Sequence, residues 1–440
     1  MPEAAERCRV AVIGGGAAGL MAAIAAAKSW HGQAAAEHLP DGKRPVILVE
    51  KLDRVGKKLL TTGNGRCNLS NLNLSMDHYH GQDPIFARNV LEKYPVNQTV
   101  GLFRQLGLLC RSEDDRLYPY SLQASAVLDI LRQALNRLGV FTKTGLAVSS
   151  LLRTVDGTGY LLSGEDGRKI LADRVIVATG GMAAPGLGCD GSGYGLLAGF
   201  GHTRTPVFPA LVQVRTDTAM VRSLAGIKFE GTATVKAGKK RIRTAHGEVL
   251  ITEYGLSGPP LLDLSRSVAQ HLQDHPEEPV DIVLDLLPEM TFPELADWLD
   301  ERRQIDSDLD LSDFLTGLVN KKLGQAVLKK CLEQKSTLSA PVSTLQRHDL
   351  QRLSGLLKSL SIRVAGTRDW TSAQVTAGGL ATGDFMPDTL ESRLAKGLYA
   401  AGEILDIDGD CGGFNLQWAW SSGQAAGHAA MLSSLKDIPR

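Results

Sequence analysis

A short apolar stretch near the N-terminus runs into a glycine-rich turn and then into a second apolar stretch. Val10–Ile13 is typical of a buried parallel strand, and Leu20–Ala27 is typical of a helix. Gly14, Gly16 and Gly19 stand between them at the spacing G-x-G-x-x-G. Glycine permits a tight turn, a close approach to a ligand and close packing of the helix on the strand. The pattern therefore predicts that a pyrophosphate binds at the start of this helix.

The next predicted strand ends in an acidic residue. Val46–Val49 is followed by Glu50, whose carboxylate is placed to accept hydrogen bonds from ribose hydroxyls. The alternative is a strand-end carboxylate that meets only solvent. Residues 29–45 are rich in Ala, His, Gly and Pro, and we expect them to form a loop insertion between the two strands. Together these features predict an opening β-α-β unit that binds a dinucleotide.

The composition of the chain limits the classes of protein to which it can belong. The chain has 440 residues, with 48 basic and 48 acidic side chains, so no overall charge attracts it to nucleic acid or to an anionic membrane. Basic residues cluster locally in 236–243 and 321–330, where a solvated surface is the alternative to a binding patch. The N-terminus is polar and acidic, and the apolar run after Gly19 is too short to span a bilayer. We expect neither a signal peptide nor a membrane segment.

The six cysteines are widely spaced and form no C-x-x-C motif. This predicts neither a paired redox site nor a zinc site, and the histidines show no metal-ligand spacing, so no metal is expected. A sparse set of cysteines is typical of the reducing cytosol, and we expect a cytoplasmic protein.

Residues 54–71 are basic and rich in Gly and Asn, which favours a loop wrapped around an anion. Apolar spacing predicts helices over 84–107 and 122–138, the second ending at Gly139. Short strands are expected over 140–153, 160–163, 169–172 and 174–177.

The pattern of predicted elements changes near residue 203, and near residue 367 it returns to the pattern of the nucleotide-binding domain. Between them we expect strands over 211–216, 231–236, 241–251 and 279–285, followed by helical segments over 292–303, 310–334 and 343–360. The predicted organisation is therefore a nucleotide-binding domain in 1–202 and 367–440, a β-barrel-like domain in 203–290 and a helical subdomain in 291–366.

Two later glycine motifs fit the same nucleotide-binding domain. One strand meets Gly180 and Gly181, and a C-terminal strand meets Gly402 and Glu403. A final helix is expected from Gly412 onward, with Asn415, Leu416 and Gln417 supplying first-turn N–H groups. Trp418 and Trp420 are expected in the core. A further G-x-G-x-x-G in 186–191 follows no strand, so we predict no second domain dedicated to NAD.

Two side chains are candidates for proton transfer. Cys67 follows Arg66 in the glycine-rich loop, which would favour a thiolate, although a buried structural cysteine is the alternative. Tyr254 lies in the segment 251–260, a strand that ends in a turn rich in Gly and Pro. That turn either presents Tyr254 to a substrate or is purely structural.

Taken together, these motifs resemble the YhiN/BaiN family of bacterial FAD-binding proteins, also called the aminoacetone oxidase family or NAD(P)/FAD-dependent oxidoreductases. The resemblance covers almost the whole chain and rests on Gly14–Gly19, Lys57–Asn71, Ala178–Gly181, Gly255–Pro259, Val375–Gly379 and Gly412–Ala419. It implies an α/β fold in which a Rossmann-like, three-layer ββα domain holds FAD without a covalent bond. It also implies an inserted β-barrel with a helical part.

The fingerprint and the resemblance together predict the cofactor contacts. The residues expected to bind FAD are Gly14, Gly16, Ala17, Ala18, Gly19, Glu50, Lys51, Lys58, Gly65, Arg66, Cys67, Asn68, Val148, Ala178, Thr179, Gly180, Gly181, Gly402, Glu403, Gly413, Asn415, Leu416 and Gln417.

The activities attributed to the family set three hypotheses. The first is NAD(P)H-driven reduction of a polarised C=C bond, in which Cys67 or Tyr254 donates the proton. Uracil in ribosomal RNA, giving dihydrouridine, is the preferred substrate because the basic clusters suit phosphates, although the zero net charge opposes it. A steroid-like enone is another substrate of this kind. The second hypothesis is an amine oxidase that produces hydrogen peroxide, and the third is a flavin-bearing protein without turnover.

Overall fold

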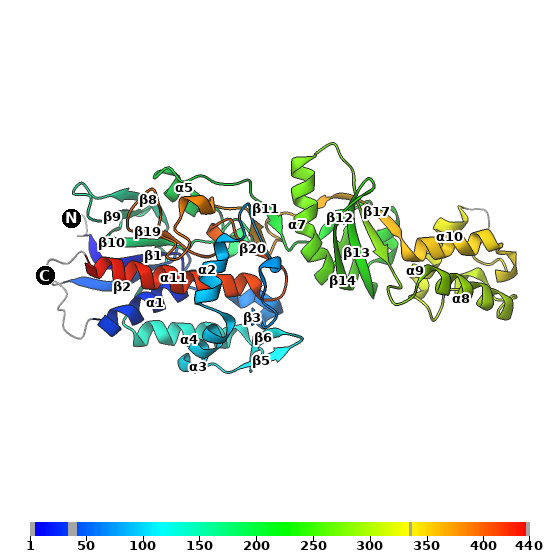
Figure 1. The fold of residues 1–440 in the computed structure, drawn as a ribbon, viewed down its shortest axis with the longest axis horizontal. Coiled ribbons are helices and arrows are strands. Elements are labelled where there is room, and N and C mark those ends of the chain that lie inside the picture. The colour runs from blue at the N-terminus through cyan, green and yellow to red at the C-terminus, as the bar shows by residue number, and fades with distance from the viewer. Residues whose placement is uncertain (1–4, 34–41, 334–336, 437–440) are drawn as a thin grey trace. The chain divides into compact units, whose positions relative to one another are not determined.

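The computed structural model describes residues 5–33, 42–333 and 337–436 and divides the chain into two compact units (Figure 1). Unit 1 combines Met1–Phe208 with Val375–Arg440, and unit 2 is Pro209–Gln374. The expected domain boundaries after residues 202 and 366 lie close to these divisions. Among the described residues, every helix is too short or too polar to cross a membrane.

Unit 1 is built on a mixed sheet with the strand order β7-β2-β1-β10-β9-β8, in which β19 also pairs with β10. The strands are β1 (Glu6–Ile13), β2 (Lys43–Val49), β7 (Phe141–Lys143), β8 (Val148–Arg153), β9 (Tyr160–Gly164), β10 (Lys169–Val177) and β19 (Leu398–Ala400). Strands β7, β2, β1, β10 and β19 are parallel, whereas β8 and β9 form antiparallel pairs. The segments 169–172 and 174–177, expected as separate strands, form the single strand β10.

Two long helices pack against each other in unit 1, α1 (Ala17–Gln33) and α11 (Phe414–Lys436). Their backbones approach closely, because a Cβ on Gly423 would lie 2.5 Å from the Ala18 carbonyl oxygen, and one on Gly427 would lie 2.2 Å from that of Ala22. The expected loop over 29–45 is wrong for residues 29–33, where α1 continues, and for residues 43–45, where β2 has already begun. Residues 34–41 lie outside the described residues.

The expected helix over 84–107 is two helices, α2 (Phe86–Lys93) and α3 (Val96–Leu106). Pro95 separates them, since it lacks an N–H and disfavours a helical conformation in the preceding residue. Helix α4 (Ala124–Arg137) ends as predicted, with Gly139 at a φ of 66°. The remaining short elements of unit 1 are β3 (Ser70–Asn71), β4 (Tyr79–His80), β5 (Cys110–Glu113), β6 (Arg116–Pro119), α5 (Ser192–Ala198), β18 (Val375–Ala377) and β20 (Asp408–Gly409).

Unit 2 contains a closed barrel with the strand order β12-β15-β14-β13-β16-β17. The strands are β12 (Val214–Thr216), β13 (Lys228–Ala237), β14 (Lys240–Thr252), β15 (Gly255–Ser257), β16 (Val280–Asp285) and β17 (Leu360–Thr367); the short strand β11 (Phe208–Ala210) precedes them. Three helices, α8 (Phe292–Ile305), α9 (Lys321–Leu332) and α10 (Arg347–Lys358), are inserted between β16 and β17. The barrel is therefore not confined to 203–290, because its closing strand follows the helical part.

Unit 2 also holds elements that sequence patterns did not predict. Helix α6 (Thr218–Val221) is a single turn, and α7 (Pro259–Asp274) packs against β14. The expected turn at 259–260 is instead the first turn of α7, where proline is well tolerated. The buried residues Leu261, Leu264 and Val268 recur at helical spacing along it.

Candidate functional site

The N-terminal glycine turn has the geometry that a dinucleotide requires. Gly14 has a φ of 105°, and a Cβ there would lie 2.4 Å from the Ala178 carbonyl oxygen. A Cβ on Gly19 would lie 1.8 Å from the Gly14 oxygen, whereas one on Gly16 would meet no protein atom within 4 Å. Two of the glycines are thus required by the protein's own packing. The third leaves open space beside the start of α1, where a pyrophosphate fits.

Glu50 is buried at the end of β2, and its two oxygens already accept backbone hydrogen bonds. One oxygen accepts from the Gly15 N–H and the other from the Leu52 N–H, each at 2.8 Å. These bonds fix the carboxylate and leave a second lone pair on each oxygen for ribose hydroxyls. The chain from Lys143 to Leu146 lies alongside, since the Glu50 N–H donates to Lys143 and the Leu146 N–H to Glu50. This pairing leads into β8, which begins at Val148.

Lys58 and Glu403 form an ion pair across 345 positions of sequence. The Lys58 ammonium lies 2.8 Å from one carboxylate oxygen of Glu403, and the Thr376 N–H donates to the other at 3.0 Å. Burial acts to lower the pKa of Lys58, but Cys189 and Glu403 together raise it above its ordinary value. Lys58 is therefore a fixed positive charge. A Cβ on Gly180 would lie 2.9 Å from the Cys189 sulfur, so this group adjoins the turn after β10.

Other predicted residues lie near this ion pair. Lys51 pairs with Asp190 at 2.6 Å, so its ammonium is already engaged by the protein. A Cβ on Gly181 would lie 2.3 Å from the Thr376 hydroxyl oxygen, and one on Gly193 would lie 1.9 Å from that of Thr179. The glycines after β10 and at the start of α5 are thus required for close packing.

Tyr194 is a residue that sequence patterns did not single out. Its hydroxyl is buried and has no hydrogen-bond partner within the described part of the chain, and burial raises the pKa of the phenol. A Cβ on Gly193, the residue before Tyr194, would lie 3.0 Å from Cδ1 of Ile404, so α5 packs beside the residue that follows Glu403. An unpaired buried hydroxyl beside the ion pair fits a bound polar ligand.

The start of α11 presents a second cradle. Gly413 has a φ of 100°, and a Cβ there would lie 2.5 Å from the Ser70 carbonyl oxygen and 2.7 Å from the Asn68 side-chain oxygen. That Asn68 oxygen is buried and has no partner among the described residues. The N–H groups of Asn415 and Leu416 lie in the first turn of α11, where a ligand oxygen is favoured.

The prediction that Gln417 supplies a free N–H group is wrong. Its N–H donates to the Gly413 carbonyl at 2.9 Å, because the helical hydrogen-bond ladder of α11 has already begun there. Its side chain is fully buried and occupied as well, accepting from the Ser70 hydroxyl at 2.7 Å and donating to Thr99 at 2.9 Å. Gln417 therefore holds the loop beneath α11. Trp418 and Trp420 are buried, as predicted.

The expectation that Arg66 favours a Cys67 thiolate is also wrong. The guanidinium of Arg66 pairs with Glu113 at 2.8 Å and lies 4.1 Å from the centre of the Tyr118 ring. Cys67 itself is fully buried, and this burial raises its pKa to about 12. The Cys67 side chain is therefore a neutral thiol at physiological pH, which fits the alternative that Cys67 is a buried structural cysteine.

Tyr254 lies in unit 2, in the turn between β14 and β15. The guanidinium of Arg368 lies 4.8 Å from the centre of its ring, and its carbonyl accepts from the Thr216 N–H at 3.1 Å. These contacts fix the turn. A catalytic role for Tyr254 stays a prediction.

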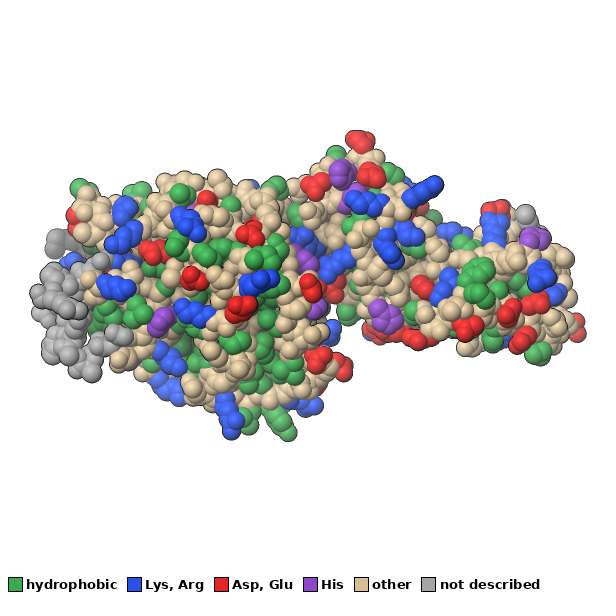
Figure 2. Space-filling view, in the orientation of Figure 1, with side chains coloured by type: hydrophobic (Ala, Val, Ile, Leu, Met, Phe, Trp, Pro, Cys, Tyr) green, Lys and Arg blue, Asp and Glu red, His purple; other side chains and the backbone are tan. Residues whose placement is uncertain are grey.

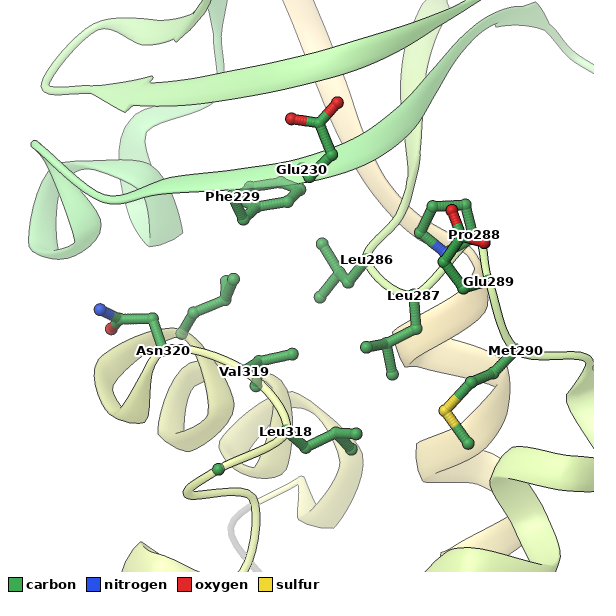
Figure 3. A pocket seen from close by; sticks show the side chains of 12 residues that line it. Phe229, Glu230, Leu286, Leu287, Pro288, Glu289, Met290, Leu318, Val319 and Asn320 are labelled. Carbon is green, nitrogen blue, oxygen red and sulfur yellow. The ribbon is translucent and has the colours of Figure 1, made fainter.

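Unit 2 has an open pocket of about 480 Å³ between β13 and the turns that precede α8 and α9 (Figure 3). Phe229, Leu286, Met290 and Leu318 point toward it, whereas Glu230 points away. No His, Cys, Lys or Tyr side chain lines this pocket. Across the described residues, no three His, Cys, Asp or Glu side chains converge to hold a metal ion. The polar groups that could serve a redox cofactor are those of unit 1.

Comparison with known proteins identifies the family of this chain. The model of the HI0933-like protein Rossmann domain matches residues 8–429. The chain belongs to the HI0933-like family. This confirms the predicted α/β fold with a Rossmann-type domain and an added barrel, and it agrees with the resemblance to YhiN/BaiN proteins.

Two relatives align over nearly their whole length. The chain is 40% identical over 428 residues to a 3-dehydro-bile acid delta(4,6)-reductase of Clostridium scindens, covering 96% of this chain and 98% of that protein. It is 30% identical over 423 residues to a ribosomal RNA dihydrouridine synthase of Escherichia coli, covering 96% and 97%. This HI0933-like protein is therefore an FAD-dependent oxidoreductase.

Solved structures support the fold. A 3-ketosteroid delta1-dehydrogenase of Sterolibacterium denitrificans superposes with a TM-score of 0.50 at 15% identity, covering 97% of this chain and 100% of that one. A quinol-fumarate reductase with menaquinol superposes with a TM-score of 0.50 at 16% identity, covering 100% of this chain and 73% of that one. The open space at Gly16 and the unpaired Asn68 oxygen are the features of this chain that fit FAD.

Proposed function

We propose that this protein uses NAD(P)H to reduce a C=C bond conjugated to a carbonyl group. The convergence in unit 1 of the glycine turn, the Lys58–Glu403 pair and the start of α11 carries the proposal. FAD, when bound, supplies the hydride transfer from the nicotinamide to the carbon β to the carbonyl.

The residues around the site have separate tasks in this proposal. The open backbone at Gly16 and the N-terminus of α1 bind the pyrophosphate, and Glu50 binds a ribose. Lys58 is held as a cation by Glu403 and neutralises negative charge on the cofactor. The first-turn N–H groups of α11 would donate to ligand oxygens and favour a more negative flavin, and the unpartnered side-chain oxygen of Asn68 would accept a hydrogen bond from a ligand N–H.

Uracil in ribosomal RNA is our preferred substrate because unit 2 carries an unpaired basic turn. Lys236, Lys239, Lys240 and Arg241 lie at the turn between β13 and β14. None of these cations forms an ion pair within the described residues. Figure 2 shows Lys and Arg side chains on the visible face of the barrel. Such a turn suits contacts to phosphates.

A free enone is the second candidate substrate. The relative with 40% identity is named for a bile acid rather than for RNA, and that identity exceeds the 30% shared with the dihydrouridine synthase of Escherichia coli. Both substrates place a C=C bond next to a carbonyl, so one active site chemistry serves either.

The decisive experiment mixes anaerobic, NADPH-reduced holoprotein with one of three partners: ribosomal RNA from a strain without the gene, a 3-keto-Δ4 steroid, or buffer. We expect the flavin to reoxidise with RNA and a uridine to gain two hydrogen atoms by mass. Reoxidation by the steroid alone would select the enone. Hydrogen peroxide formed from a small primary amine without NADPH would overturn the proposal in favour of an amine oxidase.

Variants of the basic turn sharpen the choice of substrate. Replacing Lys236, Lys239, Lys240 and Arg241 with Gln should weaken RNA binding and reduce its salt dependence, by about 0.7 in the log–log slope for each phosphate that is no longer neutralised. Reduction of the flavin by NADPH should not change. The matched control removes four charges at exposed positions of unit 1 outside both basic clusters: Lys28→Gln, Arg88→Gln, Arg104→Gln and Lys169→Gln.

A further inference from the structure

A buried carboxylate lies between two histidine rings at the start of α11. Asp410 is 8% exposed. One of its oxygens lies 3.2 Å from Nδ1 of His78, and the other lies 2.7 Å from Nε2 of His80. The Asp410 N–H also donates to the His78 carbonyl at 3.0 Å. Strands β4 and β20 pair beside this cluster and hold the two segments together.

The cluster is fixed to the first turn of α11. The His78 ring stacks on the Phe414 ring, with centroids 4.2 Å apart and planes 16° apart. The Tyr79 hydroxyl donates to the Phe414 carbonyl at 3.0 Å, and the Asn415 side chain both accepts from and donates to Gly409. The histidines therefore lie beside the first turn of α11, which we assign to the flavin ring.

Each ring keeps one nitrogen for another partner. Asp410 engages Nδ1 of His78 and Nε2 of His80, and the opposite nitrogens have no hydrogen-bond partner among the described residues. The two side chains are 30% and 20% exposed, so these nitrogens are accessible. Imidazole exchanges protons near neutral pH, and a carboxylate behind the ring orients it and stabilises its charged form.

We propose that His78 and His80 are the proton donors of the reaction and that Asp410 positions them. The proposal rests on the function proposed above. Reduction of a conjugated C=C bond needs a hydride and a proton. The hydride bonds to the β carbon as the π bond breaks, and the electron pair of that bond takes a proton from an imidazolium at the α carbon. The neutral imidazole then recovers a proton from water, while NAD(P)H becomes NAD(P)⁺.

The surroundings favour this pair over the donors predicted from sequence. Cys67 is fully buried with its thiol pKa raised to about 12, and the ring of Tyr254 is already engaged by Arg368, whose guanidinium lies 4.8 Å from its centre. Three other acids lie near the histidines. Asp77 precedes His78 in the short helix Met76–His78, and Asp408 lies opposite His80 in the β4–β20 pair. The third, Asp406, accepts from the Gln82 N–H. The first turn of α11 contributes no acid. Among the acids in this part of unit 1, Asp410 is the one that contacts both rings.

The test separates the two half-reactions of the holoprotein. The variant His78→Gln/His80→Gln should reoxidise at least about 100-fold more slowly with the conjugated substrate that the wild type accepts. Its FAD content and its anaerobic reduction by NADPH should stay within about threefold. In Asp410→Asn both rings lose the carboxylate that orients them, so reoxidation should slow at least about tenfold and its pH profile should change. His348→Gln, an exposed histidine on α10, is the matched control.

A second readout needs no turnover. In NMR spectra of the protein without substrate, the ring signals of both His78 and His80 should move in Asp410→Asn, because each ring loses its hydrogen bond to the carboxylate. If the double variant loses FAD, His78→Gln alone is used, and it should slow reoxidation at least tenfold. Unchanged rates and pH profiles in variants that retain FAD would overturn the assignment of the proton donors. A wild type that no conjugated C=C compound reoxidises would instead overturn the proposed function.

Discussion

The interiors of the two units contrast. Among the described residues, the polar side chains that are buried in unit 2 are three small hydroxyl groups, those of Thr216, Ser265 and Ser354. The rest of its core is apolar. Unit 1 buries charged and amide side chains that include Glu50, Asp410 and Gln417. Burying such groups is costly unless each one is paired. The contrast indicates that unit 1 is organised around a polar ligand, whereas the interior of unit 2 serves packing.

The largest effect should come from the apolar core of unit 2. Phe314 is fully buried, and Phe314→Ala should lower the free energy of unfolding by about 3 to 5 kcal/mol. Flavin bound per folded molecule should not change. Denaturant unfolding with flavin absorbance measures both quantities, and Phe292→Ala, at a position 44% exposed, is the control. Loss of flavin from folded Phe314→Ala would break the contrast between the units.

The next effect should come from the cofactor cradle of unit 1. A side chain at Gly16 meets no protein atom within 4 Å, so Gly16→Val should fold normally but occupy the space of the pyrophosphate. We expect FAD to bind at least about 100-fold more weakly, which equals about 2.7 kcal/mol. Fluorescence titration of the apoprotein gives the dissociation constant. Gly195→Val, an exposed glycine of α5 with equally open surroundings, should bind FAD as the wild type does.

A buried ion pair of unit 1 should matter more than a surface pair. Lys58 and Glu403 are 19% and 22% exposed, and Glu403→Gln turns an amide toward the Lys58 ammonium. We expect about 2 kcal/mol of lost stability, reduced from the value for a fully buried pair by partial solvent access. Asp53→Asn breaks the exposed Lys57–Asp53 pair and should leave the free energy of unfolding nearly unchanged. Thermal unfolding compares the two, and equal losses would contradict the difference in burial.

The smallest effect should come from Cys67. Because burial raises its pKa to about 12, the folded protein carries a neutral thiol at pH 8. Iodoacetamide should therefore modify Cys67 only after unfolding, whereas an ordinary exposed thiol near its reference pKa would react. Mass spectrometry of the alkylated peptide tests this. The turnover of Cys67→Ala should stay within about threefold of the wild type. A 100-fold loss of turnover would support the hypothesis that Cys67 is the proton donor.

The nucleotide-binding half of the fold was predictable because its signals are local. Parallel strands buried on both faces are continuous apolar runs, so β1 and β10 stand out beside their glycines. Strand β17 was missed although Leu360, Ile362 and Val364 alternate with exposed residues, because the alternation directly follows the apolar spacing of α10. Helix α7 was missed because its two prolines suggested a turn.

The candidate site was predictable only where one short motif carries it. Gly14, Gly16 and Glu50 belong to a single β-α-β unit. The partners of His78 and Lys58 lie 332 and 345 positions away, and nothing in their local sequence indicates the pairing. The state of Cys67 depends on burial, which its basic neighbour Arg66 does not determine. Electrostatic guesses from adjacent residues fail when side chains turn toward distant partners.

The close packing of α1 against α11 has a consequence for biosynthesis. Helix α1 begins at Ala17, yet the helix that covers it ends at Lys436, and β19 joins the same sheet only from Leu398. During translation, the apolar surface of the N-terminal strands and of α1 therefore stays exposed until the ribosome has synthesised almost the entire chain. The sequence of unit 2 emerges completely before that moment. We expect prematurely terminated chains to be captured by chaperones or degraded, since a message truncated before α11 encodes no complete flavin domain.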